Sequence, residues 1–419
     1  MLSPQKMRFA DFFLNWKTFL IFNVLIFAIK IFFSVYHNFS AEYFEDWRIA
    51  KNVALDEVYS LNLKYGSSAY KLPVYPLFLS FFIKIFGALG AVKFIIITQH
   101  IFYFSIPVVI IKTFENLNLK VAGFLSAYLF IFSPSYFYYS NILEATNLFI
   151  LFFAVWLYLY SELWMQRRSL WKLITFSVMT AILALTQVVA IPLMILMILL
   201  LFFYKKLLVK NIALVFLIAG ICYSPWVIRN YISFDKLVMS KSPVWQNIYL
   251  GYVSEYQILP DNHFITEQDE KKIAVHIGEN DEFVGEQIYE NEVHKIIEAD
   301  QWAPLKKGIN NLISLWYVPK RYFDDNSLSI LVGRKAYVMI INILLLLSLL
   351  YFFKNNKSLF LFLCVVFAGF TFPYLVGHAA NIRFKLDFEW IQNSVIALFI
   401  FLKYLNKKQP SDKETVNLF

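Results

Sequence analysis

The sequence predicts an all-α, polytopic membrane protein. Hydrophobic residues make up 59% of its 419 positions, and the mean hydropathy is +0.57. Soluble domains are nearer to half apolar. Apolar runs close to the roughly 20 residues that cross a bilayer as a helix recur along the chain. Both cysteines, Cys222 and Cys364, lie inside such runs, so neither a disulfide framework nor a thiolate metal site is expected.

Ten apolar runs are predicted to cross the membrane. The first follows a short basic segment and precedes no small-residue cleavage site, so we interpret it as a retained helix rather than a signal peptide. The predicted spans are 19–35, 94–111, 121–137, 145–162, 173–188, 189–204, 211–228, 336–353, 358–376 and 387–403.

Loop charge tests this count. With a cytoplasmic N-terminus, the ten spans place almost all strongly basic short loops on the cytoplasmic side, as the positive-inside rule requires. The agreement fails if the run from Val74 to Leu89 is a further span, so we predict a short re-entrant or interfacial helix there, on the outer face. The net charge of +9 is therefore a topology signal, and no nucleic-acid partner is expected.

Four regions are predicted. Residues 1–228 form an N-terminal transmembrane module that includes an outer loop at 36–93. Residues 229–335 hold 16 of the 29 acidic residues and show apolar positions at helical spacing, which indicates a small helical outer subdomain with solvated acidic faces. Residues 336–403 are C-terminal transmembrane helices, and 404–419 are a cytoplasmic tail.

Charged residues at the outer ends of spans are costly without a partner or a function. They are Asp46 in EDWRIAKNV, Glu144 in SPSYFYYSNILEATN, Arg229 in SPWVIRNY and Arg383 in GHAANIRFK. Each has a structural alternative: a salt bridge between Glu144 and Arg229, a snorkelling anchor at Arg383, or a solvated loop acid at Asp46. The sequence lacks a Walker A loop, a Rossmann glycine fingerprint and a Gly-x-Ser-x-Gly elbow, which argues against a nucleotide-driven pump or a serine hydrolase.

Five features in order resemble the GT-C superfamily of integral-membrane glycosyltransferases, in the branch of protein O-mannosyltransferases and lipid A aminoarabinose transferases. They are EDWRIAKNV, KLPVYPLFLSFFIKIFG, SPSYFYYSNILEATN, PWVIRNYISFDKLVMSKSPVWQNIYLGY and RFKLDFEW. The chain departs from the family in having Leu72 before Pro73 where two prolines are common, Glu144 where Asp is common, and no proline soon after Arg383.

The resemblance implies transfer of a sugar from a polyprenyl-phosphate donor to an acceptor on the outer face. It implies Asp46 and Glu144 as the catalytic-loop acids, and Lys71, Arg229 and Arg383 as basic residues that meet the lipid phosphate. The substrate pocket is expected to include Trp226, Asn230, Gln246, Asn247 and His378.

The chemistry fits these residue types. An acceptor hydroxyl needs a base, for which Asp46 is the candidate, and cations stabilise the departing phosphate. No cofactor is required, because the sugar-phosphate bond supplies the driving force, although two acids near a phosphate are also compatible with a divalent ion. Expected partners are the lipid-linked donor, membrane lipids and a protein, lipid or glycan acceptor. The expected location is a bacterial inner membrane, with both termini cytoplasmic and the active site periplasmic.

Two other functions stay open. A carrier or flippase for lipid-linked sugars would show buried midspan charges and broken helices in matched halves. A non-catalytic structural subunit is the third possibility. The transferase hypothesis predicts that Asp46, Lys71, Glu144, Arg229 and Arg383 converge in one outer cavity.

Overall fold

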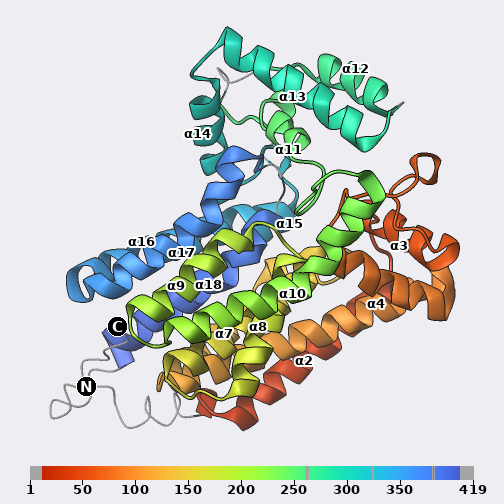
Figure 1. Cartoon of the computed structure of the whole chain (residues 1–419). Helices are drawn as coiled ribbons and strands as arrows, with labels where there is room; N and C mark the ends of the chain where they lie inside the picture. The colour runs from red at the N-terminus through yellow and green to blue at the C-terminus, as the bar shows by residue number, and fades with distance from the viewer. Residues whose placement is uncertain are drawn as a thin grey trace.

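The computed structural model describes residues 12–259, 264–278, 280–322, 325–379, 381 and 383–405 (Figure 1). Within them the regular elements are helices, and the only β pairing is one isolated bridge, which confirms the all-α prediction. Seven helical segments are long and apolar enough to cross a membrane, as expected for a multi-pass membrane protein. They contain α2 (Trp16–Tyr36), α4 (Val74–Asn116), α7 (Ala145–Trp164), α10 (Val209–Phe234), α16 (Tyr337–Asn355), α17 (Lys357–Val376) and α18 (Arg383–Ile400).

The other three predicted spans coincide with shorter apolar helices. These are α5 (Lys120–Ile131), α8 (Leu170–Ala184) and α9 (Ala190–Phe203). At 1.5 Å per residue they are roughly 18 to 23 Å long, less than the hydrocarbon thickness of a bilayer. The predicted span 121–137 is divided because Pro134 starts a separate short helix, α6 (Pro134–Tyr139), at a position where its missing N–H costs nothing.

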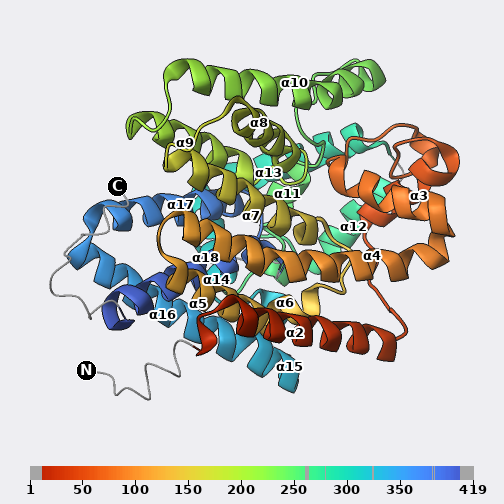
Figure 2. The ribbon, with the colours of Figure 1, turned by 90° about the horizontal axis from the view of Figure 1, so that it is seen from below.

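Helix α4 is a hairpin of two limbs. The chain reverses at Gly87, whose φ of 72° lies in the region that favours glycine. The first limb then packs on the second: the Tyr75 hydroxyl donates to Gln99 at 2.9 Å, and the Phe86 and Phe94 rings stack at 3.9 Å. The run from Val74 is therefore a short helix attached to the following span. The second limb lies beside α2 along the bundle (Figure 2).

One face of α7 carries a continuous stack of aromatic rings. Successive ring centroids are 5.6, 5.8, 5.5 and 6.0 Å apart along Phe149, Phe153, Trp156, Tyr160 and Trp164. These residues are buried, and they belong to the main hydrophobic core of the bundle. Offset ring stacking of this kind adds to the energy of burial, so α7 is a fixed central element against which the site is built.

The loop-rich end of the bundle carries residues 37–73, 132–144, 185–189, 235–259, 264–278, 280–322, 325–327, 377–379 and 381. Above it lie α11 (Trp245–Leu250), α12 (Glu267–Gly278), α13 (Glu282–Ala299) and α14 (Ala303–Trp316), at the top of Figure 1. This subdomain has its own core, which includes Tyr249, Tyr289 and Val293. Helix α10, which leads into this subdomain, continues to Phe234, six residues past the predicted end of the span at 228.

Candidate active site

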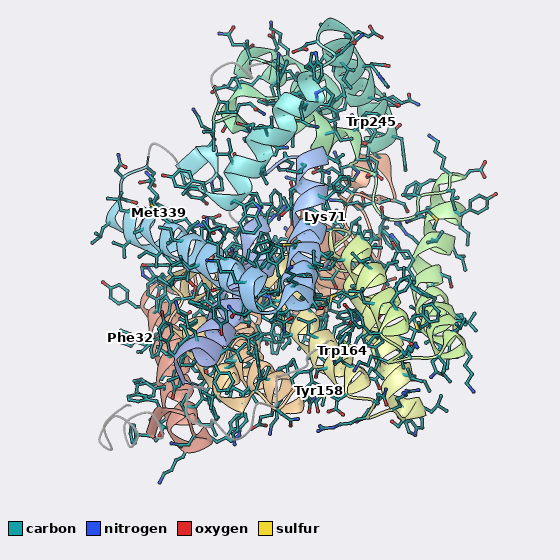
Figure 3. The ribbon with its side chains drawn as sticks, turned by 90° about the vertical axis from the view of Figure 1, so that its left-hand side faces the viewer. Phe32, Lys71, Tyr158, Trp164, Trp245 and Met339 are labelled. Atoms are coloured by element: carbon teal, nitrogen blue, oxygen red, sulfur yellow. The ribbon has the colours of Figure 1, made fainter. Side chains whose placement is uncertain are left out.

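A cavity of about 270 Å³ lies at the loop-rich end. Figure 3 shows Lys71, one of its lining residues, where the bundle meets the subdomain that carries Trp245. Its walls come from α3 (Glu45–Asp56), the segment before α4, the loop after α10, and the facing ends of α17 and α18. We name it the charged cavity. Its polar lining residues include Asp46, Lys71, Thr186, Gln187, Ser240, Lys241, Asn247, Tyr374, His378 and Arg383.

Asp46 lies in the first turn of α3 and is only 3% exposed. Carboxylates are favoured there because the N-terminus of a helix carries partial positive charge. Ile49 and Ala50 are fully buried, and Ala50 packs into the cluster that includes Tyr75 of α4. Burial of this face holds α3 on the bundle and points Asp46 into the cavity.

Lys71 faces two carboxylates. Its Nζ lies 3.3 Å from Glu45 Oε2 and 3.6 Å from Asp46 Oδ2. Burial by itself raises the pKa of Glu45, but the Lys71 ammonium and local hydrogen bonds outweigh burial, so the pKa is lowered. Lys71 lies two residues before Pro73, the N-cap of α4, so the start of that helix fixes its position.

Arg383 forms a close ion pair with Glu144. Arg383 Nη1 donates to Glu144 Oε1 at 2.8 Å, and the Glu144 side chain is 2% exposed. Burial raises the pKa of Glu144, and Arg383 offsets part of that effect. The sequence-based alternative of a Glu144–Arg229 salt bridge is therefore wrong. Glu144 Oε2 is buried, and within the described residues it has no hydrogen-bond donor.

Lys241 lines the same cavity and was not predicted from the sequence. In the described part of the chain its ammonium has no hydrogen bond or ion pair within 4 Å. Burial, together with the charges of Lys71 and Arg383, lowers the pKa of Lys241 to about 8. The only sequence signal was its place in the phrase PWVIRNYISFDKLVMSKSPVW, where nothing distinguished it from Lys236.

Arg229 does not reach the charged cavity. Its guanidinium donates to the Ser68 carbonyl at 2.7 Å and to the Tyr59 carbonyl at 3.0 Å. It also lies 5.1 Å from the Tyr59 ring centroid and 5.3 Å from that of Trp226. Arg229 therefore stabilises the segment from residue 59 to 68. It lies outside the cavity in which a ligand phosphate would bind.

The other predicted pocket residues divide in two groups. Asn247 and His378 line the cavity, and burial together with nearby positive charge lowers the pKa of His378 to about 3, so it is neutral at pH 7. Trp226 Nε1 donates to the Ser240 carbonyl at 2.6 Å, and Asn230 Nδ2 donates to the Val238 carbonyl at 3.1 Å. These two side chains therefore hold the segment that carries Lys241.

Predicted residue Gln246 is also outside the cavity lining, and it shows how α13 positions the site. Glu286 accepts hydrogen bonds from the backbone N–H groups of Val244, Trp245 and Gln246 at 2.8, 2.7 and 3.1 Å. These residues come three to five positions after Lys241. The subdomain thus fixes the loop that bears the unpaired cation.

Glu282, one helical turn earlier on α13, fixes the segment before Lys71. Its Oε2 accepts from Ser68 Oγ at 2.6 Å, and its Oε1 accepts from the Ala69 N–H at 2.7 Å. Burial raises the pKa of Glu282, although the bonds from Ser68 and Ala69 oppose the shift. Two glutamates on one helix therefore position both lysines of the charged cavity.

The charges around the cavity are unevenly matched. Lys71 and Arg383 are paired with carboxylates, whereas Lys241 is not, in the part of the chain that is described. An anion that binds between these three cations would lie beside the buried carboxylate of Asp46. The arrangement combines a potential general base with a site for a negatively charged leaving group.

No protein-family model matches the chain, and no curated protein has a significantly similar sequence.

Proposed function

We propose that this protein is a membrane glycosyltransferase that resembles the GT-C superfamily and uses a polyprenyl-phosphate sugar as donor. The observation that carries the proposal is the presence of buried Asp46 in one cavity with Lys71, Lys241 and Arg383. A carboxylate beside convergent cations suits the attack of a hydroxyl and the departure of a phosphate.

In the proposed reaction, the acceptor oxygen attacks the anomeric carbon of the donor sugar. Asp46 accepts the hydroxyl proton as the new carbon–oxygen bond forms. The bond between the anomeric carbon and the phosphate oxygen breaks, and its electron pair leaves with the lipid phosphate. Lys71, Lys241 and Arg383 stabilise the charge that develops on that phosphate, and no nucleotide or other cofactor is consumed.

Glu144 acts through Arg383 in this scheme. Its ion pair of 2.8 Å orients the guanidinium at the first residue of α18. Because a phosphate leaving group needs no proton, a second acid is not required at this step. Glu144 is therefore proposed as a positioning residue.

The loop-rich end is proposed to face the periplasm of a bacterial inner membrane. At the opposite end lie the turns at 117–119, 165–169 and 204–208, which contain or adjoin most of the basic short-loop residues. The positive-inside rule assigns those turns to the cytoplasm. The acceptor would then be an extracytoplasmic protein, lipid or glycan.

The test replaces Asp46 with Asn in protein assayed in native membranes with undecaprenyl-phosphate-linked sugars. Loss of a general base lowers turnover by about 10² to 10⁴-fold. Asp56→Asn is the matched control, because Asp56 is exposed in the last turn of the same helix. Full activity in Asp46→Asn would remove Asp46 from the mechanism.

The carrier alternative draws on charged residues buried in or beside the spans, but internal contacts account for these. Lys30 donates to the Tyr136 carbonyl at 2.8 Å and to Ser140 Oγ at 2.9 Å, and Arg334 pairs with Glu389 at 2.9 Å. Such groups tie helices together, and among the described residues they leave no series of free charges along a path. Transbilayer movement of a labelled donor in vesicles, without sugar transfer, would favour the carrier.

A further inference from the structure

A second cavity of about 440 Å³ lies on the other side of the segment 67–71. We name it the polar groove. Its volume is within the range of about 300 to 1,000 Å³ typical of ligand sites. It shares no lining residue with the charged cavity. Its walls come from α3, the loop 60–70, the end of α10 and the start of α13.

The two cavities are separated by a thin wall. Tyr70 lines the polar groove, whereas the next residue, Lys71, lines the charged cavity. Arg48 and Asp46, two residues apart on α3, are divided in the same way. Because adjacent Cα atoms are only about 3.8 Å apart, a molecule that contacts Tyr70 in the groove lies one residue from Lys71, which faces Asp46 in the charged cavity.

The side chains of the groove suit a carbohydrate. The lining combines aromatic residues, including Tyr65 and Phe283, with residues that carry amides and hydroxyls, such as Asn62, Gln287 and Ser67. A sugar presents apolar C–H faces that pack on aromatic rings and a rim of hydroxyls that both donate and accept hydrogen bonds. A purely apolar lipid tail would leave most of these polar groups unsatisfied.

The acids of the groove are already engaged. Asp281 caps α13 by accepting from the Phe283 and Val284 N–H groups at 2.8 and 3.1 Å, and Glu282 holds Ser68 and Ala69 as described above. The exposed Arg48 also lines the groove, and in the described residues its guanidinium has no ion pair. The groups left for a ligand are therefore chiefly donors and hydroxyls.

Ser60 gives an independent indication of a missing polar partner. Ser60 belongs to the groove wall and is fully buried, and its hydroxyl has no hydrogen-bond partner among the described residues. Its own carbonyl is occupied by Asn52 Nδ2 at 2.8 Å. Buried hydroxyls are seldom left unpaired, so a polar partner of this one is missing from the described residues beside the groove.

We propose that the polar groove binds a carbohydrate acceptor, whose reacting hydroxyl extends past the segment 67–71 to Asp46 in the charged cavity. This inference rests on the proposed transferase function, and it selects the glycan among the three acceptor classes. The donor phosphate then occupies the charged cavity, and the acceptor reaches the base from the opposite side of the segment 67–71.

Blocking the groove tests this assignment. In a Cys222→Ser, Cys364→Ser background, Gln287→Cys is coupled to a bulky maleimide, and Glu298→Cys on α13 serves as the labelled control, because Glu298 is exposed away from the groove. Undecaprenyl-phosphate-linked mannose, glucose and aminoarabinose are supplied to native membranes. We expect labelled Gln287→Cys to lose at least tenfold in sugar transfer while it retains donor hydrolysis by water.

The acceptor class is tested in the same assay with wild-type protein and a solubilised membrane extract. Periodate, which cleaves vicinal diols, should abolish the acceptor capacity of the extract, and protease should leave it intact. Protease-sensitive acceptor, unchanged transfer after groove labelling, or equal loss of donor hydrolysis would each overturn the groove assignment. Absence of transfer from every donor with wild-type protein would remove the proposed function, and the acceptor assignment with it.

Discussion

Glu286 offers a direct test of how the subdomain positions Lys241. Its carboxylate accepts three consecutive backbone N–H groups, those of Val244, Trp245 and Gln246. Replacement of Glu286 with Ala leaves these donors without a partner. The loop that carries Lys241 should then open more often, although helix α13 itself should stay folded and keep its core contacts.

The expected free-energy cost of Glu286→Ala follows from the solvent exposure of the three N–H donors. Val244 is exposed, so water replaces the carboxylate there, whereas Trp245 and Gln246 are partly buried. Each of these two unpaired donors costs about 1 to 1.5 kcal/mol, or about 2 to 3 kcal/mol together. At about 1.4 kcal/mol per tenfold, the local opening equilibrium should rise by roughly 30 to 150-fold.

Hydrogen exchange measured by mass spectrometry reports the protection of these three backbone amides. With protein in nanodiscs, the peptide covering 242–250 should lose protection in Glu286→Ala and retain more of it in Glu286→Gln. Glu290→Ala is the matched control, because Glu290 lies one turn further along α13 and pairs only with the exposed His294, at 3.8 Å. Unchanged protection in Glu286→Ala, or equal loss in Glu290→Ala, would refute the positioning role.

Three further predictions concern the charged cavity. Lys241→Met should weaken binding of undecaprenyl phosphate by about 10 to 150-fold, as expected for loss of a charge-assisted hydrogen bond, whereas Lys241→Arg should retain the affinity. Titration calorimetry measures the affinity of both variants. An affinity in Lys241→Met equal to that of the wild type would contradict the assignment. Because the pKa of Lys241 is about 8, its ammonium is charged below that pH, so wild-type binding should weaken as pH rises through about 8, while Lys241→Arg should show a flatter profile. Glu144→Ala should lower the free energy of unfolding by about 3 kcal/mol, because it leaves the largely buried Arg383 without a compensating charge. Thermal unfolding should show that the Glu144→Ala, Arg383→Ala double variant recovers part of this stability. Unchanged stability in Glu144→Ala would show that the ion pair contributes little.

The membrane-spanning architecture was readable from the sequence because a bilayer imposes both length and composition on a helix. Every predicted run coincides with an apolar helix. The shortened α5 could have been anticipated from Pro134, which ends one helix and begins another. Loop charge predicted a short helix instead of a full span from Val74, but the reversal at Gly87 depends on a backbone conformation that hydropathy does not report.

The site was predictable to the extent that helix ends determine it. Asp46, Glu144 and Arg383 lie at the starts of helices, and Lys71 lies just before α4, all at the same end of the bundle, so topology alone brings them near one another. Arg229 differs because α10 extends beyond it, and its side chain is therefore directed by the helix toward the segment 59–68.

Lys241 was missed for a physical reason. It lies in an irregular loop where neither periodicity nor hydropathy constrains a side chain. Its position depends on distant residues of α10 and α13 that hold that loop. Contacts of this kind become visible only when the chain is folded.

The ties between distant segments have a consequence for biosynthesis. The Ser68–Glu282 hydrogen bond joins residues 214 positions apart, and the Arg383–Glu144 pair joins residues 239 positions apart. A nascent chain that ends near residue 280 already contains Asp46, but it lacks both Glu282 and Arg383. The charged cavity therefore cannot be completed during translation until α18, which begins at Arg383, has been made and inserted.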